Sequence, residues 1–466
     1  MKFVRLMILG VVGAFLLGTP SLALAQSGTT GAFAGVVRDA TGGVLPGVTV
    51  EAASPALIEK VRIAVTDGQG QYKIFDLRPG TYDVTFTLTG FSTFRREGIE
   101  LSTGFTMTAN ADLAVGGLEE TVVVSGASAV VDVHDTRSSN VLTRTQIDAL
   151  PTNKSTSGFA ALTLGAIGAV QDVGGNTGEA PTGFGVHGTS SGQGKHLMDG
   201  MPMNGLLFGS SLGTRLNFVN QLAIEEVSMT TRGGSAETET GGPQINYIPK
   251  EGSNIFSFVA AATAANESMQ SSKLTDTLKA RNVTSAPGLK RLHDVGAGFG
   301  GPIAQDRMWF YLSSRWWDTE TYAPGMHFQD KTAPAARGGI IWVPDLNRPA
   351  YSRSPNKDGT IRMTWQATER NKFVISENIQ YNCFCFQGVS LGQAPTATVD
   401  IFGNSSMTQV TWSHPRSNRL LFEGGFTGLY QTQHPSRPEN VSTTDIAVQD
   451  TGLGLAYNAR AFSAGN

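Results

Sequence analysis

The chain has 466 residues, a length that suggests two to four domains. Its formal net charge is -3, from 35 Lys and Arg against 38 Asp and Glu, so no long-range field favours binding to nucleic acid or to an anionic membrane surface. Charged residues make up only 16% of the chain and glycine fills 56 positions, a composition that favours an all-β chain with many turns.

The first 25 residues have the pattern of a secretory signal peptide. Lys2 and Arg5 supply the positive start, residues 7–17 are apolar, and residues 23–25 (Ala-Leu-Ala) form a small-residue cleavage site. A membrane anchor is the weaker interpretation because the apolar run is short for a membrane span. No later segment reaches the apolar length of a membrane helix, so a mature membrane protein would have to cross as a barrel.

Residues 26–115 alternate short strands with turn signals, at a spacing typical of a β-sandwich. The turn signals Gly-x-Val, Leu-Pro-Gly, Asp-x-x-Gly-x-Tyr, Leu-x-Pro-Gly-x-Tyr and Gly-Phe follow one another in this segment. Together they resemble the carboxypeptidase regulatory-like domain, a transthyretin-like β-sandwich. Peptidase activity is not implied, because no His in the chain is followed by Glu three residues later. We expect a spacer, with carbohydrate or peptide binding as the alternative role.

A β-branched run between glycines follows the sandwich segment. Its residues are Glu120, Thr121, Val122, Val123 and Val124. An extended run of this kind can add as a strand to the exposed sheet edge of a partner through main-chain hydrogen bonds. The run resembles a TonB box, which implies the TonB complex of the inner membrane as a partner. An ordinary strand is the alternative interpretation, since main-chain pairing tolerates many sequences.

A short helix is predicted after residue 143. Thr143 and Gln146 have the spacing of a capping box, Ile147 and Leu150 would share one face, and Pro151 would end the helix.

Residues 116–250 resemble the plug domain of TonB-dependent outer-membrane transporters, a mixed α+β domain. The resemblance rests on paired positions in chain order: His187 and Gly188, Asp199 and Gly200, Gly241 and Gly242, and finally Asn246. Asp-Gly between apolar residues also predicts a tight hairpin by itself. The chain departs from the family at His187, where Arg is usual, and at residues 237–238, where Tyr-Gly is usual.

Catalytic patterns in this region are weak. Residues 188–192 fit Gly-x-Ser-x-Gly, but the segment that follows predicts a strand rather than the helix that such a nucleophile requires. His187, His196 and Asp199 could converge on a metal, although three polar groups of a surface hairpin are the favoured interpretation. We therefore expect no enzymatic activity, no cofactor and no metal.

Residues 251–466 contain long segments in which apolar and polar side chains alternate. Residues 360–367 and 372–381 each place apolar side chains on one face and polar ones on the other, as transmembrane β-strands do. Cys383 and Cys385 would share a face of the second strand. A local disulfide after export, two packed thiols and a bridge within a turn all fit this spacing.

Residues 300–303 (Gly-Gly-Pro-Ile), followed by an aromatic strand, resemble the Oar-like subgroup of TonB-dependent receptors, which also carries the N-terminal sandwich. About seven or eight strands fit after residue 253, whereas plugged transporters have about 22. An eight-stranded barrel is filled by its own side chains and cannot hold a plug. We therefore expect the sequence to be the N-terminal part of a longer protein, with a partial transmembrane antiparallel β-barrel.

The resemblance implies four segments: a signal peptide (1–25), a regulatory-like sandwich (26–115), a plug (116–250) and the first part of a barrel (251–466). It implies a receptor in the outer membrane of a Gram-negative-type bacterium, in contact with membrane lipid and the TonB complex. The receptor would take up a large solute (an oligosaccharide, siderophore or peptide) through TonB-driven remodelling of the plug. No nucleic acid is expected as a partner. The alternative function is a secreted or surface β-sandwich adhesin that binds carbohydrate.

Overall fold

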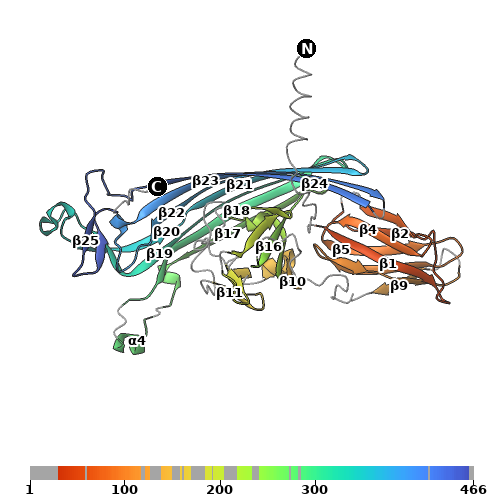
Figure 1. Cartoon of the computed structure of the whole chain (residues 1–466), viewed down its shortest axis with the longest axis horizontal. Helices are drawn as coiled ribbons and strands as arrows, with labels where there is room; N and C mark the ends of the chain where they lie inside the picture. Colours follow the sequence, from red (N-terminus) through yellow and green to blue (C-terminus); the bar gives the residue numbers. More distant parts are fainter. Residues whose placement is uncertain are drawn as a thin grey trace, which may run out of the picture.

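The computed structural model describes residues 30–57, 60–116, 121–125, 138–149, 158–159, 162–168, 184–190, 193–203, 218–232, 241–271, 274–281, 285–417 and 420–460. The predicted signal peptide lies outside the described residues. Most described residues belong to strands, which confirms the expected all-β character. Figure 1 shows a β-sandwich at one end, a broad curved sheet, and a smaller sheet beneath the curved one. We call these parts the N-terminal sandwich, the large sheet and the inner sheet.

The N-terminal sandwich consists of two facing sheets. One contains β1 (Gly31–Asp39), β4 (Gln71–Leu77), β7 (Thr106–Thr108) and β8 (Ala111–Leu113). The other has the order β3 (Val61–Val65), β2 (Thr49–Ala53), β5 (Gly80–Thr87), β6 (Thr93–Leu101) and β9 (Thr121–Ser125).

Alternating side chains of β5 build the core of the sandwich. Tyr82, Val84 and Phe86 point inward and are fully buried. The ring of Tyr82 lies 5.5 Å from that of Phe33, and the ring of Phe86 lies 5.7 Å from that of Tyr72, both from the opposite sheet. Burial of each such side chain contributes about 1.5–3 kcal/mol to the stability of the sandwich.

The inner sheet lies between the sandwich and the far end of the large sheet. Its order is β10 (Ser138–Thr143), β15 (Ile224–Arg232), β16 (Gln244–Pro249), β13 (Lys195–Met198) and β14 (Met201–Pro202). Beside it, β11 (Ala166–Gly168) pairs with β12 (Phe184–Val186), and η2 (Gln221–Ala223) leads into β15.

The helix expected after residue 143 is confirmed as α2 (Arg144–Ala149). Thr143 donates its backbone N–H to Oε1 of Gln146 at 3.0 Å, which is half of the predicted capping box, and Ile147 is buried. Pro151, the predicted stop, lies outside the described residues.

The large sheet is an eight-stranded antiparallel array in the described part of the chain. Its strands are β17 (Ser257–Asn266), β18 (Gly288–Ala304), β19 (Met308–Gln329), β20 (Pro344–Arg353), β21 (Asn356–Thr368), β22 (Asn371–Gln387), β23 (Val399–Ser417) and β24 (Leu420–Ser436). Most neighbours are consecutive in sequence, as in a meander, while β21 pairs with both β19 and β22. β17 and β24 are the two edges of this array.

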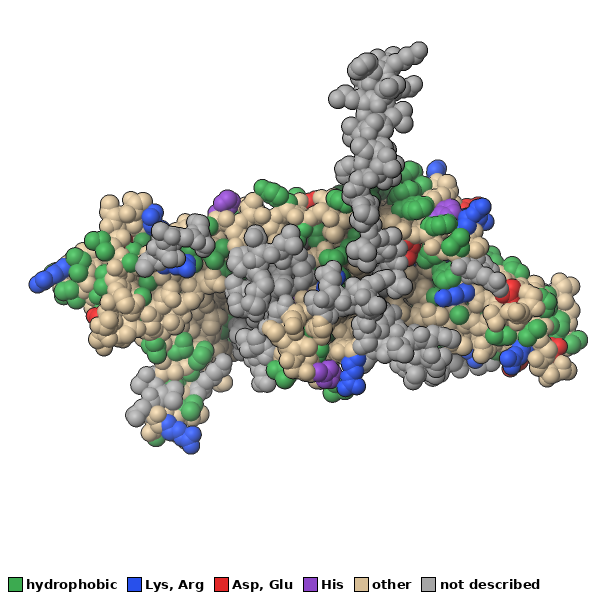
Figure 2. All heavy atoms as spheres, viewed as in Figure 1, with side chains coloured by type: hydrophobic (Ala, Val, Ile, Leu, Met, Phe, Trp, Pro, Cys, Tyr) green, Lys and Arg blue, Asp and Glu red, His purple; other side chains and the backbone are tan. Residues whose placement is uncertain are grey.

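The two faces of the large sheet differ in polarity, as the alternating pattern predicts. Ile361 and Trp365 of β21 are each 44% exposed on the outer face, whereas Arg362 and Thr364 are buried on the concave face. In Figure 2 apolar side chains are visible along the outer, upper edge of the sheet. The concave face holds the inner sheet, where Gln409 donates to the backbone oxygen of Met198 at 3.1 Å.

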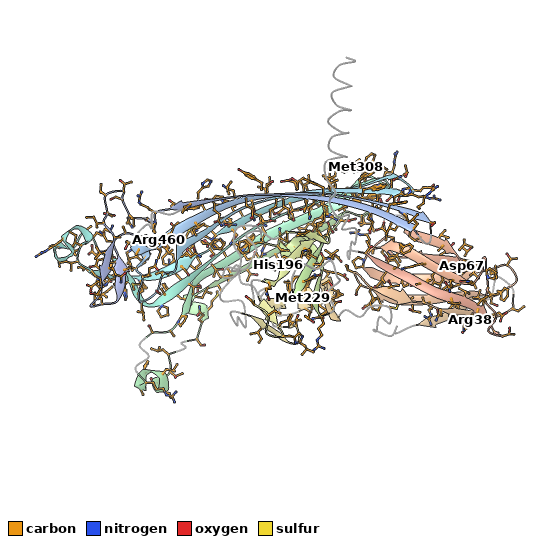
Figure 3. The ribbon with its side chains drawn as sticks, viewed as in Figure 1. Arg38, Asp67, His196, Met229, Met308 and Arg460 are labelled. Carbon is orange, nitrogen blue, oxygen red and sulfur yellow. A yellow bond between two sulfur atoms is a disulfide. The ribbon has the colours of Figure 1, made fainter. Side chains whose placement is uncertain are left out.

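The two ends of the large sheet also differ. Short turns after Ala304 and Thr368 join strands at the end that faces the sandwich. Figure 3 shows Met308 at that end and Arg460 at the opposite one. The opposite end carries the long connections, which include η3 (Glu267–Met269), α4 (Asp276–Ala280), η4 (Pro334–Gly339), η5 (Pro395–Ala397), β25 (Val448–Asp450) and β26 (Leu455–Tyr457). Among the described residues, no helix is both long and apolar enough to cross a membrane.

Cys383 and Cys385 form a disulfide near the end of β22. Their Cα atoms lie 5.4 Å apart, closer than two alternate residues of a regular strand. The strand is irregular here, because its register against β23 shifts between Phe384 and Gln387 and Phe386 has a φ of 55°. This local bend brings the two cysteines close enough for a local disulfide, which is one of the three arrangements that the spacing allowed.

Candidate functional site at the junction of the three parts

A buried cluster of charges joins the inner sheet to the wall formed by the large sheet. Arg362 projects from β21 and donates Nη1 to Oδ2 of Asp199, at the tip of the β13–β14 hairpin. Its Nη2 donates to Oε1 of Glu251 at 3.0 Å, in the segment between β16 and β17. Each of the three side chains is less than a tenth exposed. Arg78 of the sandwich approaches Glu251 at 3.4 Å, so all three parts of the molecule meet here.

The two carboxylates of this cluster have different electrostatic environments. Burial would raise the pKa of Glu251, but the positive charges of Arg78, Arg362 and Lys372 hold that pKa well below its ordinary value. Burial dominates at Asp199 and raises its pKa, because Arg362 only partly compensates for the lost water. The surroundings therefore favour the ionised form of Glu251 but disfavour that of Asp199. Asp199 is the weaker of the two attachments to Arg362.

A second buried contact attaches the sandwich to the large sheet. Asp76, at the end of β4, is 3% exposed and has a φ of 55°. Its carboxylate accepts from Nζ of Lys372 at 3.3 Å and from Oγ of Ser413 at 3.1 Å, and Arg62 lies 3.6 Å away. Because β22 and β23 supply these donors beside their short turns, the sandwich is fixed at that end of the sheet.

A third contact joins the sandwich directly to the inner sheet. Glu226 of β15 accepts from the backbone N–H of Thr103 at 3.1 Å and from its hydroxyl at 2.7 Å. Burial raises the pKa of Glu226 to about 7, although the Thr103 hydrogen bonds favour the carboxylate. At pH values between the ordinary pKa of a glutamic acid and this raised pKa, Glu226 therefore takes up a proton when the protein folds.

Glu226→Gln is expected to flatten the pH dependence of thermal stability. The raised pKa means that stability from this group is complete below about pH 4.5, falls as pH rises towards 7, and is lost above 7, by roughly 3 kcal/mol in all. Unfolding midpoints of the detergent-solubilised protein at pH 5 and pH 8 measure the slope. Glu225→Gln is the matched control, and an equal slope in the Glu226 and Glu225 variants would contradict the assignment.

A polar network holds the segment before η2 against the wall. Asp358 of β21 accepts from Asn220 at 2.7 Å, from Gln380 at 2.9 Å and from Asn378 at 2.6 Å. Gln380 also accepts from the backbone N–H of Phe218 at 2.8 Å. Between this segment and the wall, the described residues leave a cavity of only about 40 Å³. This space between the described residues is large enough for water but not for a larger solute.

The predicted motif residues of the inner sheet fall into two groups. Asp199 and Gly200 form the expected hairpin turn, with φ values of 51° and 73°, and the Gly200 N–H donates to Oδ1 of Asn246 at 2.9 Å. His187 and Gly188 lie elsewhere, at a turn after β12, where Nε2 of His187 accepts from Arg232 at 3.3 Å.

The residues weighed as a metal set face different partners. Asp199 pairs with Arg362, His187 contacts Arg232, and the buried ring of His196 stacks on Tyr247 at 6.2 Å. Figure 3 places His196 and Met229 within the inner sheet, beneath the large one. No group of three His, Cys, Asp or Glu side chains suited to a metal occurs within the described residues.

Gly241 and Gly242 differ in their surroundings although they are adjacent. A Cβ on Gly242 would lie 2.3 Å from the backbone oxygen of Gln193, whereas a Cβ on Gly241 would meet nothing within 4 Å. The missing side chain of Gly242 thus lets the start of β16 approach the segment before β13.

Gly242→Ala is expected to loosen the parallel pairing of β13 with β16. The added methyl group has to push backbone apart, at a cost of about 1–3 kcal/mol. Hydrogen exchange of the β13 amides measures the effect, and Gly241→Ala is the matched control. Similar exchange in both variants would show that the close approach is unimportant.

The predicted TonB-box residues Thr121 to Val124 form most of β9, and Glu120 lies outside the described residues. β9 pairs in parallel with β6 of the sandwich, with Thr93 opposite Thr121 and Glu97 opposite Ser125. β9 is therefore an added strand of the sandwich, whereas its pairing with the TonB complex stays a prediction.

Sequence reasoning missed the charges that join the three parts. Arg362 was recognised only as a polar position on the inward face of a strand, and its partner Asp199 lies 163 residues away in sequence. Asp76 lies at the end of β4, and Arg78 and Glu251 lie in connections, where no pattern in the sequence indicates their partners. The one available signal was an arginine facing the interior, where it requires an anionic partner.

Comparisons with known proteins bear on both halves of the chain. Residues 32–114 match the family description "Carboxypeptidase regulatory-like domain". The chain is 31% identical over 471 aligned residues to a protein described as "TonB-dependent transporter Oar" from Myxococcus xanthus. That alignment covers 96% of this chain and 39% of the relative, so the chain spans well under half of the relative's length.

Solved structures also resemble the chain in part. The siderophore receptor PirA from Acinetobacter baumannii has a TM-score of 0.43 at 17% identity, over 64% of this chain and 40% of that one. The outer membrane transporter YddB from Escherichia coli has a TM-score of 0.45 at 13% identity, over 62% of this chain and 39% of that one.

Proposed function

We propose that the protein acts as a TonB-dependent outer-membrane receptor that takes up a large solute. The observation that carries this proposal is the large sheet, which is apolar outside and polar inside and holds a separate globule on its concave face. An apolar outer face suits hydrocarbon, and buried ion pairs on the inner face suit a wall around a plug. The 31% identity to the Myxococcus xanthus transporter supports the same function.

The orientation in the membrane follows from the two ends of the sheet. In outer-membrane barrels short turns face the periplasm and long loops face outward. The N-terminal sandwich would then lie in the periplasm, since it contacts the short-turn end through Asp76 and Lys372. A sheet in lipid needs partners at both edges, so further strands have to pair with β17 and β24 in the working receptor.

The TonB complex would apply force to the receptor at β9. TonB would pair with residues 120–124 as an added strand. β9 is the last strand in the order β3-β2-β5-β6-β9, so a pull by TonB would act on its pairing with β6. The sandwich would therefore keep the TonB box paired with β6 until TonB pulls this strand away.

Opening of the path would break the contacts of the inner sheet with the wall. The small cavity between the segment before η2 and the wall supports this step, because a solute could pass there only if these contacts parted. Burial disfavours the ionised form of Asp199, so its ion pair with Arg362 would be a weak attachment at which the β13–β14 hairpin could detach. The transported solute would be an oligosaccharide, a siderophore or a peptide, and no reaction would be catalysed.

Membrane fractionation of the full-length protein tests the placement. We expect it in the outer-membrane fraction, with a gel mobility that changes on heating because a folded barrel binds less detergent than an unfolded chain. A protein that remains dissolved in buffer as a compact monomer would overturn the proposal and favour the carbohydrate-binding adhesin.

A further inference from the structure

A carboxylate lies on the outer face of the large sheet, midway between two rows of aromatic side chains. Glu377 of β22 projects on the same face as Ile375 and Ile379, which are 52% and 61% exposed. Four residues before it is Phe373, stacked at 5.7 Å on Trp365. Four residues after it is Tyr381, at the level of other exposed rings.

The depth of Glu377 follows from strand geometry. Four residues of a strand span about 13 Å, which a tilt of about 40° reduces to about 10 Å along the membrane normal. Aromatic rows mark the two boundaries of the apolar band, which is about 25 Å tall. In the proposed membrane placement, on which this inference rests, Glu377 therefore lies near the middle of the hydrocarbon.

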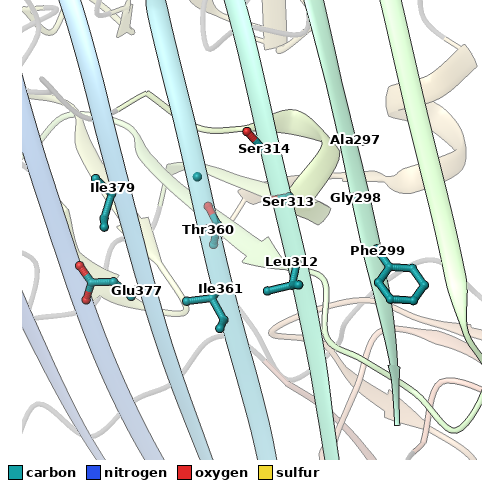
Figure 4. A pocket seen from close by; sticks show the side chains of 11 residues that line it. Ala297, Gly298, Phe299, Leu312, Ser313, Ser314, Thr360, Ile361, Glu377 and Ile379 are labelled. Atoms are coloured by element: carbon teal, nitrogen blue, oxygen red, sulfur yellow. The ribbon is translucent and has the colours of Figure 1, made fainter. Parts of the chain in front are cut away.

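Glu377 borders a shallow hollow in this face. The hollow measures about 490 Å³ and lies over Gly359, where an added Cβ would meet nothing within 4 Å. Figure 4 shows Phe299, Leu312, Ile361, Glu377 and Ile379 around it, from four adjacent strands. The surrounding surface is thus indented at the depth at which the acid lies.

Two hydroxyl groups hold the carboxylate in place without neutralising it. Ser406 and Thr408 of β23 each donate to one of its oxygens. Within the described residues no cation forms an ion pair with it, and Lys357, on the same face of the neighbouring strand, lies over the ring of Trp316 at 5.5 Å. A charged acid at this depth is costly unless a partner supplies a positive charge.

We propose that the hollow beside Glu377 is a docking site for another membrane-spanning protein that presents a Lys or Arg at mid-depth. Charge complementarity selects this occupant. Lipid head groups lie at the membrane boundary and acyl chains carry no donor, so only a polypeptide brings a cation to the middle of the bilayer. The indentation over Gly359 lets such a chain approach closely.

Model transmembrane peptides test the chemistry on the full-length protein in lipid nanodiscs. The probes are helices of Leu and Ala with Lys at the centre, with Leu at the centre, or with Lys moved to one end. We expect the central-Lys peptide to bind about ten-fold more tightly than the other two. Glu377→Leu and Glu377→Gln should both remove this preference, since neither keeps the charge.

The outcomes separate the alternatives. Equal binding of the three peptides, or a preference that survives Glu377→Leu, would overturn the proposal. Retention of lipid alone in native mass spectrometry would overturn the proposal in favour of a lipid site. Self-association that depends on Glu377 would overturn it in favour of a second copy of the chain. Glu377→Leu should not lower the unfolding midpoint in detergent, whereas a purely structural acid would. The assay uses protein with heat-modifiable mobility, so failure of the outer-membrane proposal is recognised separately.

Discussion

Deletion of residues 120–124 from the full-length protein is expected to abolish energy-dependent uptake while ligand binding at the cell surface stays unchanged. Residues 121–124 of this segment lie in β9, which pairs with β6 of the sandwich. Ligand would meet the long connections at the opposite end. Loss of the strand removes the proposed handle for TonB without touching either the inner sheet or those connections. Uptake of labelled ligand, measured beside binding in energy-depleted cells, separates the two effects.

A matched pair of point variants tests whether the main chain or the side chains of this strand matter. Val122→Ile keeps every N–H donor and the β-branched shape, so uptake should be retained. Val122→Pro removes a donor and fixes φ, so strand addition should fail and uptake should fall to the level of the deletion. Uptake that persists after the deletion would refute the role of this segment as the TonB box.

The features that sequence predicted are those with a local physical cause. The two faces of β21 follow from alternation, because successive side chains of any strand point to opposite sides. The hairpin at Asp199 and Gly200 follows from the positive φ values that this pair tolerates. The start of α2 follows from the spacing of Thr143 and Gln146. None of these required knowledge of the rest of the chain.

The features that sequence did not predict depend on distant partners. β9 was recognisable as a strand, but main-chain pairing carries little sequence information, so its partner β6 could not be identified. The disulfide of Cys383 and Cys385 depends on a bend in β22 that the alternating pattern does not predict. The charged junction combines the turn after β4, the hairpin of the inner sheet and the wall, which only the folded chain brings together.

The junction has a consequence for how force would travel. Asp76 and Arg78 lie close together in the sandwich, yet Asp76 is held by Lys372 of the wall and Arg78 approaches Glu251 beside the inner sheet. A pull on β9 would first separate it from β6, while the sandwich stays fixed to the wall through Asp76. Tension carried further along the chain to the inner sheet would then act on the contacts of that sheet at Glu226 and Glu251.

Arg362→Met is expected to detach the β13–β14 hairpin from the wall. The substitution leaves Asp199 buried without a counter-charge and removes one of the cations around Glu251, a loss of about 3–5 kcal/mol for a buried pair. Hydrogen exchange of the β13 amides should accelerate by roughly a hundred-fold or more, and large antibiotics that wild-type cells exclude should enter. Heat-modifiable mobility should be unchanged, since the β21 backbone pairing does not depend on this side chain.

Arg315→Met is the control, because Arg315 is equally buried on the concave face but pairs with Asp294, which is a third exposed and can turn to water. That variant should leave the hairpin protected. Addition of Asp199→Asn to Arg362→Met should recover part of the lost protection, since the uncompensated charge is then gone while Arg78 still faces Glu251. If hydrogen exchange of the β13 amides is the same in Arg362→Met and Arg315→Met, the hairpin is held by the shape of the wall alone. The ion pair of Arg362 with Asp199 would then not be what attaches it.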